Sequence, residues 1–126
     1  MSLPENLRYT KDHEWIRLED GNIAVIGITD FAQKELGDIV YIEIETVGQH
    51  LDADSVFGTV EAVKTVSDLY LPVTGKIIEV NSALAGSPEL VNTEPYDGGW
   101  MVKMEVKNPE DISKLLDFAA YQAVVA

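Results

Sequence analysis

The sequence predicts a mainly β protein, an antiparallel sandwich or flattened barrel with short peripheral helices. Short runs in which apolar and polar residues alternate recur along the chain, and turn residues separate them, as is typical of half-buried strands. Strand and helix patterns do not alternate regularly, so a parallel nucleotide-binding sheet is not expected. The length of 126 residues suits one domain with a sizeable core.

The first expected strands are short and lie near the N-terminus. Residues 7–9 are typical of an edge strand. Residues 14–18 and 22–27 are two short apolar runs, and Asp20-Gly21 between them is a common turn dipeptide of β-hairpins. We therefore expect an edge strand that is followed by an antiparallel hairpin.

A short helix is expected to begin near Asp30 and to end at Gly37. Asp30 can cap the N-terminus, Gln33 is placed as in a capping box, and Gly37 can supply the left-handed residue that ends a helix. Such a short helix is not stable alone in water. We therefore expect Phe31 and Leu36 to dock it on the sheet.

Two later segments are predicted strands with a similar start. In residues 38–45 the alternation places Val40, Ile42 and Ile44 on the core face and polar residues on the other. Residues 75–81 begin in the same way, with a glycine, a charged residue and two aliphatic residues. This similarity hints at two related half-sheets.

The C-terminal part is expected to contain one strand between short helical segments. In chain order these are a helical turn at 82–86, another at 88–91, a half-buried strand over 100–106 with Trp100, Val102, Met104 and Val106 on one face, a helix with Asn108 as cap and Pro109 as first residue, and a last short helix capped by Asp117 that runs through Tyr121.

The composition argues against several classes of function. The chain has no cysteine, which excludes a disulfide framework, a thiol nucleophile and thiolate metal ligands. Any redox sulfur must therefore arrive on a cofactor. The formal net charge of −13 argues against nucleic acids and anionic membranes as partners. Such acidity fits a carrier that meets basic protein surfaces, and it fits equally a role in solubility alone.

No membrane span or targeting signal is expected from the sequence. No stretch approaches the ~20 apolar residues of a transmembrane helix. The first residues lack the apolar core of a secretory signal and the arginine-rich pattern of a transit peptide. We therefore expect a cytoplasmic protein, or a mitochondrial one if a transit peptide has been removed.

The residue types that usually carry catalysis or bind metals do not form a convincing set. Neither His13 nor His50 has the spacing of a metal site, and both fit ordinary turn or surface histidines. No serine lies in a nucleophile-elbow motif. Asp97-Gly98-Gly99 is not followed by a helix with a phosphate-binding lysine. The sequence thus predicts neither a catalytic residue nor a metal site.

Lys64 is the one side chain that the sequence singles out for chemistry. It lies between Val63 and Thr65 in an apolar, β-branched run, where a central strand would have to bury its ammonium. A hairpin with Lys64 at its tip avoids that cost, although the run lacks the Asn-Gly or Gly-Gly of most tight hairpins. Glu61 and Asp68 flank the lysine. We interpret Lys64 as a mobile amine on a rigid platform that carries a cofactor; the alternative is a solvated turn lysine.

Four separated motifs carry a resemblance to a known family. They are HEW at residues 13–15, GITDFAQKELGDIVYIE at 27–43, GTVEAVKTVSDLYLPVTGKIIEVN at 58–81 and NTEPYDGGWMVKM at 92–104. In this order they resemble the H proteins of the glycine cleavage system, over residues 9–121. The resemblance implies a barrel-sandwich hybrid fold, like that of lipoyl and biotinyl carriers.

The resemblance also implies the cofactor, the partners and the domain. Lys64 would carry lipoate in amide linkage, attached by a lipoate ligase or lipoyl transferase. A pyridoxal-phosphate-dependent glycine decarboxylase would load the aminomethyl group, a tetrahydrofolate-dependent aminomethyltransferase would take it over, and dihydrolipoyl dehydrogenase would reoxidise the dithiol with NAD as final acceptor. The carrier would catalyse none of these steps. It would form a single lipoyl-carrier domain over residues 1–126, with a core at about 7–107 and C-terminal helices at about 108–122.

By resemblance, Glu14 and Asp68 are the residues expected to contact the amine end of the lipoyl arm. Many family members have histidine after Thr-Asp, where this chain has Phe31, so the arm cleft is expected to be more apolar here. Biotin carriers usually have Ala-Met-Lys-Met around the lysine, whereas a valine and a threonine flank it here, which favours lipoate. Two alternatives stay open: a relay that donates lipoyl groups to other proteins, and an unmodified binding or regulatory homologue.

Overall fold

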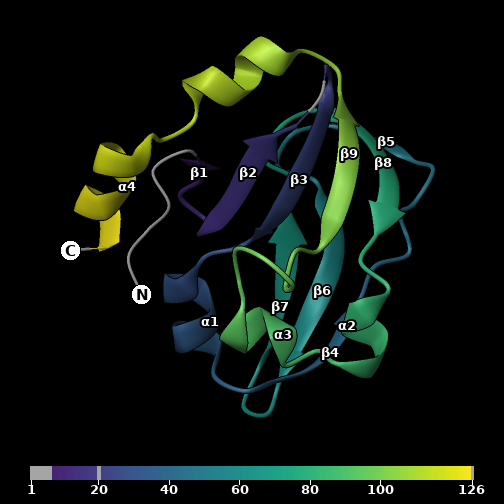
Figure 1. The fold of residues 1–126 in the computed structure, drawn as a ribbon, viewed down its shortest axis with the longest axis vertical. Helices are drawn as coiled ribbons and strands as arrows, with labels where there is room; N and C mark the ends of the chain where they lie inside the picture. Colours follow the sequence, from purple (N-terminus) through teal and green to yellow (C-terminus); the bar gives the residue numbers. More distant parts are fainter. Residues whose placement is uncertain (1–6, 20, 126) are drawn as a thin grey trace.

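Two antiparallel β-sheets form the molecule, and short helices surround them (Figure 1). The structure is a computed structural model that describes residues 7–19 and 21–125. One sheet has six strands in the order β1-β2-β3-β9-β8-β5, and the other has three in the order β4-β6-β7. This arrangement confirms the predicted mainly β, antiparallel fold. The strands are β1 Arg8–Tyr9, β2 Glu14–Leu18, β3 Ile23–Ile28, β4 Ile39–Glu43, β5 His50–Leu51, β6 Val56–Ala62, β7 Val66–Tyr70, β8 Gly75–Val80 and β9 Val102–Val106.

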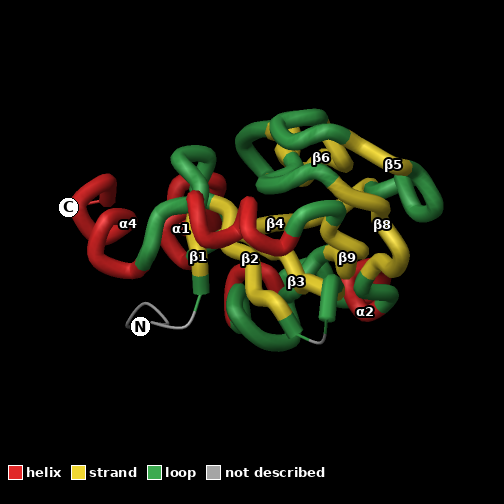
Figure 2. Tube along the Cα trace, turned by 90° about the horizontal axis from the view of Figure 1, so that it is seen from above, coloured by secondary structure: helices red, strands yellow, loops and turns green. Residues whose placement is uncertain are grey.

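The helices are short and lie at the periphery of the sheets. They are α1 Asp30–Leu36, α2 Ala83–Gly86, α3 Leu90–Thr93, the 3₁₀ helix η1 Pro109–Lys114 and α4 Phe118–Val125. Figure 2 shows α4 and α1 on one flank of the molecule and α2 on the other. Within residues 7–19 and 21–125, no helix has both the length and the apolar character needed to cross a membrane.

The main core lies between the two sheets, and a second apolar cluster covers the opposite face of β2 and β3. Ile16 and Ile26 point into the main core, whereas their neighbours Trp15 and Val25 belong to the second cluster. Alternate residues of a strand point to opposite faces, so both faces of this hairpin are buried. The C-terminal segment covers the second face because Tyr121 of α4 packs there.

The β2–β3 hairpin forms as predicted, and a glycine makes room for its tryptophan. Trp15 pairs with Gly27 across the hairpin, and its indole Nε1 donates to the Pro95 carbonyl at 2.9 Å. A Cβ atom on Gly27 would lie 2.7 Å from ring atoms of Trp15. Of the predicted turn dipeptide, Asp20 lies outside the described residues, while Gly21 has a positive φ of 55°, as a hairpin turn requires.

The N-cap of helix α1 is one residue earlier than predicted. Thr29 is the N-cap, because its hydroxyl accepts from the Ala32 amide at 3.2 Å. Asp30 therefore lies inside the helix, where its carboxylate accepts from Gln33 Nε2 at 2.8 Å. The buried residues are Ala32 and Gln33, whereas Phe31 is only half-buried. The prediction of Asp30 as cap was wrong because a threonine stood one position before it.

The predicted core face of β4 is wrong at one position because the strand contains a bulge. The register shifts between Ile39 and Tyr41, so that Val40 is 46% exposed and Ile39 is buried. Strand β8 has the same irregularity between Ile77 and Glu79. In both strands the shift begins two residues after the glycine that starts the similar segment. The common bulge supports the similarity that the sequence shows between these two segments.

The C-terminal elements differ from the predictions in detail. Met101, expected on the polar face, is fully buried just before β9, and Trp100 is half-buried. The segment after Asn108 forms a 3₁₀ helix without a side-chain cap. Asp117 caps α4 as predicted, accepting from the Ala120 amide at 2.8 Å, and the helix continues beyond Tyr121 to Val125.

Candidate functional site

Lys64 lies at the tip of the hairpin between β6 and β7, which extends beyond the rest of the molecule at the bottom of Figure 1. The Ala62 amide donates to the Thr65 carbonyl at 2.7 Å and closes the turn. The Val63 amide donates to the Asp38 carbonyl at 3.0 Å, which ties the tip to the segment before β4. Lys64 itself is exposed. The predicted hairpin position of Lys64 is confirmed.

The end of α1 provides the floor beneath the Lys64 side chain. A Cβ atom on Gly37 would lie 3.3 Å from Lys64 Cε, so the glycine leaves space for the lysine stem. Asn92 of α3 holds this floor in place. Its amide nitrogen donates to the Gly37 carbonyl and to Gln33 Oε1, both at 2.9 Å, and its oxygen accepts from the Ile39 amide at 2.9 Å. The platform of the lysine is therefore fixed by contacts from three elements.

Exposed apolar side chains surround the hairpin tip. Val63 is 75% exposed and Val66 is 64% exposed, more than any other large apolar side chain in the described part of the chain. Tyr41 of the neighbouring strand is also exposed and pairs with Glu61, which in turn pairs with Val66. A group of exposed apolar side chains on one part of a surface is typical of a contact surface for other proteins.

A cavity of about 180 Å³ lies between α1 and the edge strand β7. Glu14 and Asp68 both line it, so the structure brings together the two residues expected to contact an arm. Asp68 lies in β7, four residues beyond Lys64 in the chain. The other lining residues are the polar Asp12, His13, Glu35 and Ser67 and the apolar Ile28, Ala32, Leu36, Val60 and Leu69.

Glu14 is a buried carboxyl group with one unpartnered oxygen. Its side chain is 2% exposed, Oε2 accepts from the Tyr70 amide at 2.7 Å, and Oε1 has no hydrogen-bond partner among the described residues. Burial raises the pKa of Glu14 to about 8; the Tyr70 amide opposes this, and Asp12 and Asp54 add to it. Near neutral pH the group is therefore mostly an uncharged acid, not the carboxylate expected from the sequence.

Phe31 acts on the cavity through His13. Phe31 is not among the residues that line the cavity; its ring packs against the His13 ring, with centroids 4.6 Å apart. His13 does line the cavity and has a left-handed backbone, with φ at 65°. Residues other than glycine seldom adopt that conformation, although histidine is among those that tolerate it better. On its other side, His13 Nδ1 lies 3.0 Å from the Tyr121 hydroxyl.

Sequence reasoning missed Asn92 and Tyr121, which hold the site together, and assigned His13 an ordinary turn role. No local pattern marks these residues. Asn92 contacts Ile39, 53 positions away, and Tyr121 contacts His13, 108 positions away. Such contacts depend on how the sheets and helices pack, which alternation and capping signals do not encode.

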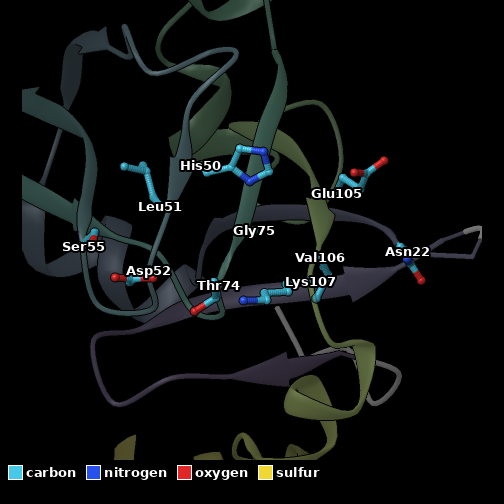
Figure 3. A pocket seen from close by; sticks show the side chains of 10 residues that line it. All are labelled: Asn22, His50, Leu51, Asp52, Ser55, Thr74, Gly75, Glu105, Val106 and Lys107. Atoms are coloured by element: carbon cyan, nitrogen blue, oxygen red, sulfur yellow. The ribbon is translucent and has the colours of Figure 1, made fainter.

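A larger cavity of about 580 Å³ lies around β5 and the start of β8, away from the hairpin tip. In Figure 3 its polar side chains, among them His50, Asp52, Glu105 and Lys107, are spread around the opening and come from separate segments. None of these four side chains is buried. No three His, Cys, Asp or Glu side chains in the described part of the chain are placed to hold a metal ion. The smaller cavity, with its buried Glu14, is the candidate site.

Comparisons with known proteins agree on one family. A sequence model described as "Glycine cleavage H-protein" matches residues 7–126. The glycine cleavage system H protein of Bacteroides fragilis is 55% identical over 125 residues, covering 99% of this chain and 98% of its own length. That of Pelodictyon phaeoclathratiforme is 59% identical over 123 residues, covering 97% and 96%. The crystal structure of a glycine cleavage system H protein from Mycobacterium marinum matches with a TM-score of 0.84 and 35% identity, covering 96% of this chain and 99% of that one.

Proposed function

Because the chain belongs to the glycine cleavage H-protein family, we propose that Lys64 is the residue to which lipoate is attached. Membership in the family makes the chain a lipoyl carrier of the glycine cleavage system and not one of its enzymes. The observation that carries the assignment to Lys64 is its place at the tip of a hairpin, exposed, with the backbone on both sides held by hydrogen bonds.

The residues around Lys64 fit this cofactor. The amine is accessible to a modifying enzyme, and the amide that forms removes a charge from an apolar tip. When bound, lipoate supplies a disulfide that can be reduced and a thiol that can hold the aminomethyl group. The cavity beside β7 offers an apolar wall that keeps water away from such a group, formed by Ile28, Ala32, Leu36, Val60 and Leu69.

Glu14 and Asp68 are proposed to hold the amine end of the loaded arm. Oε1 of Glu14 lacks a partner, so it can accept a hydrogen bond from an ammonium at the cavity wall. Glu14 would release its proton to water as the pair forms, because a nearby cation favours the charged form of a carboxyl. Asp68 lines the same cavity and adds a second acceptor. Because Glu14 is buried, the contact would be screened less by water and salt than a surface ion pair.

The specific partners belong to the same proposal. We propose that the carrier serves glycine decarboxylase, the aminomethyltransferase and dihydrolipoyl dehydrogenase, and that a lipoate ligase or lipoyl transferase modifies it. The net charge of −13 favours rapid encounter with basic surfaces. The exposed Val63 and Val66 supply apolar contact area on either side of Lys64. The cytoplasmic location expected from the sequence stays part of this proposal.

Mass spectrometry of the intact protein tests the attachment site. The wild type, Lys64→Arg and Lys34→Arg are each incubated with lipoate, ATP and a lipoate ligase. Lys34 is a matched control because it is an exposed lysine of α1. We expect one lipoyl mass on the wild type and on Lys34→Arg, and none on Lys64→Arg. Modification of Lys64→Arg, or an unmodified wild type, would overturn the assignment.

Glycine–bicarbonate exchange then tests the partner proposal. The lipoylated carrier is mixed with the decarboxylase, and exchange of labelled bicarbonate into glycine is followed. Exchange that requires the carrier and fails with Lys64→Arg supports the proposed role. If exchange fails while the lipoyl group passes to another acceptor protein, the carrier is a relay for lipoyl groups instead.

A further inference from the structure

A series of hydrogen bonds runs from the start of α1 through α4 to the wall of the cavity between α1 and β7, called the arm cavity below. The Thr29 hydroxyl lies 2.7 Å from the Tyr121 hydroxyl, which lies 3.0 Å from His13 Nδ1. Thr29 and Tyr121 are fully buried, and His13 lines the cavity. The Tyr121 ring is fixed by stacking on Tyr9, with centroids 4.5 Å apart and planes 7° apart.

Only one direction of donation along these hydrogen bonds gives every buried proton an acceptor. The Thr29 hydroxyl oxygen already accepts from the Ala32 amide, and among the described residues Tyr121 is the acceptor within reach of its proton. Because buried hydroxyl protons need an acceptor, Thr29 donates to Tyr121. The Tyr121 proton is then directed at His13 Nδ1, which must be the unprotonated ring nitrogen.

We propose that Tyr121 is a positioning residue that keeps His13 neutral, with its ring proton on Nε2, at the wall of the arm cavity. Protonation of Nδ1 would force the Tyr121 hydroxyl to act as acceptor and to turn its proton toward Thr29. The Thr29 proton would then be buried without an acceptor. The hydrogen-bond chain therefore opposes a second proton on His13, in addition to its effect on which nitrogen carries the first.

The carboxyl groups near His13 act in the opposite direction, because negative charge favours its protonated form. Four carboxyl groups line the same cavity as His13: Asp12 and Glu14 next to it in the chain, Glu35 from α1 and Asp68 from β7. Asp12 and Glu35 raise the pKa of His13, yet burial outweighs them and the pKa is lowered. Within the proposed function, a neutral His13 leaves the cavity free of a competing cation, so that an ammonium on the arm is not repelled.

Nuclear magnetic resonance of the unlipoylated protein tests the proposal directly. The ¹⁵N shifts and proton couplings of the imidazole rings identify the tautomer, and a pH titration gives the pKa. His13 and His50 are the two histidines of the chain, so His50, on β5, is an internal control in every spectrum. We expect His13 as the Nε2-protonated tautomer in the wild type. A ring protonated on Nδ1 would overturn the proposal without any variant.

Two substitutions test the role of the hydroxyl chain. Tyr121→Phe keeps the stacked ring and removes the donor; we expect mixed tautomers and a His13 pKa that rises by about one unit, the scale of one buried hydrogen bond. Thr29→Ser keeps both the cap and the hydroxyl, and should leave His13 unchanged. An unchanged tautomer and pKa in Tyr121→Phe would refute the role of Tyr121. The result does not depend on Lys64, so failure here leaves the lipoylation test unaffected.

Discussion

Replacing Glu14 by glutamine should change how the stability of the protein depends on pH. The pKa of Glu14 is raised from an ordinary 4.5 to about 8 by burial. Between these two values the folded protein holds a proton that the unfolded chain releases. Stability contributed by the protonated acid is therefore fully present below about pH 4.5 and is lost as the pH rises toward about 8. Glu14→Gln keeps the shape of the neutral acid and removes the titration.

The expected magnitude follows from the two pKa values. In the window between them, the free energy of unfolding falls by up to about 1.4 kcal/mol per pH unit. From about pH 6 to about pH 8 the contribution of Glu14 falls by about 2 kcal/mol, because the folded state itself begins to release the proton near the upper end. From about pH 6 to about pH 8, the free energy of unfolding of Glu14→Gln should therefore rise by about 2 kcal/mol relative to that of the wild type.

Urea unfolding at several pH values measures this difference. Other groups also titrate, but their contributions cancel in the difference between the wild type and a variant as long as they do not contact Glu14. Glu79→Gln, at an exposed position of β8, controls for the loss of one formal negative charge. The reasoning is refuted if the stability of Glu14→Gln runs parallel to that of the wild type from about pH 6 to about pH 8.

Two further substitutions test the packing that supports the site. Gly27→Ala should lower the free energy of unfolding by about 1–3 kcal/mol, because the new Cβ would lie 2.7 Å from the Trp15 ring. Urea unfolding measures this loss. The control is Gly86→Ala, which should not be destabilising because nothing lies within 4 Å of the new Cβ. Asn92→Ala should cost about 1–3 kcal/mol, because it leaves backbone groups at the floor of Lys64 without partners. Faster amide exchange at the hairpin tip should accompany this loss, and an unfolding free energy within about 0.5 kcal/mol of the wild type would contradict it.

Local patterns in the sequence favoured a hairpin with Lys64 at its tip, although the usual turn residues are missing. A charge among β-branched residues has one economical solution, a turn, and the register of β6 and β7 confirms it. The same kind of local reasoning failed at Val40, because a bulge moves a side chain to the other face without changing the alternation that the sequence shows. It failed at Asp30 because two adjacent residues, Thr29 and Asp30, can both cap a helix.

Local patterns could not predict the protonation of the cavity residues, for a different reason. The sequence shows that Glu14 is acidic, but its protonation depends on burial by segments that are distant in the chain. The same holds for His13, whose partner Tyr121 lies near the C-terminus. The resemblance to a family identified Glu14 and Asp68 as two residues that meet at the cavity. The raised pKa of Glu14 and the lowered pKa of His13 followed only from the packed structure.

The cavity is less negative than its composition indicates, and this suits a site that must be empty and filled in turn. Glu14 is kept uncharged by burial, so an unoccupied cavity does not hold a bare buried carboxylate, which would be strongly destabilising. In the proposed function, an ammonium that enters would provide the missing partner for Oε1, and the charge on Glu14 would form only then. His13, kept neutral by Tyr121 in our proposal, adds no opposing charge at that moment. If Glu14 holds the arm as proposed, the buried acid would thus bind a cation while the empty protein avoids most of the cost of an unpaired charge.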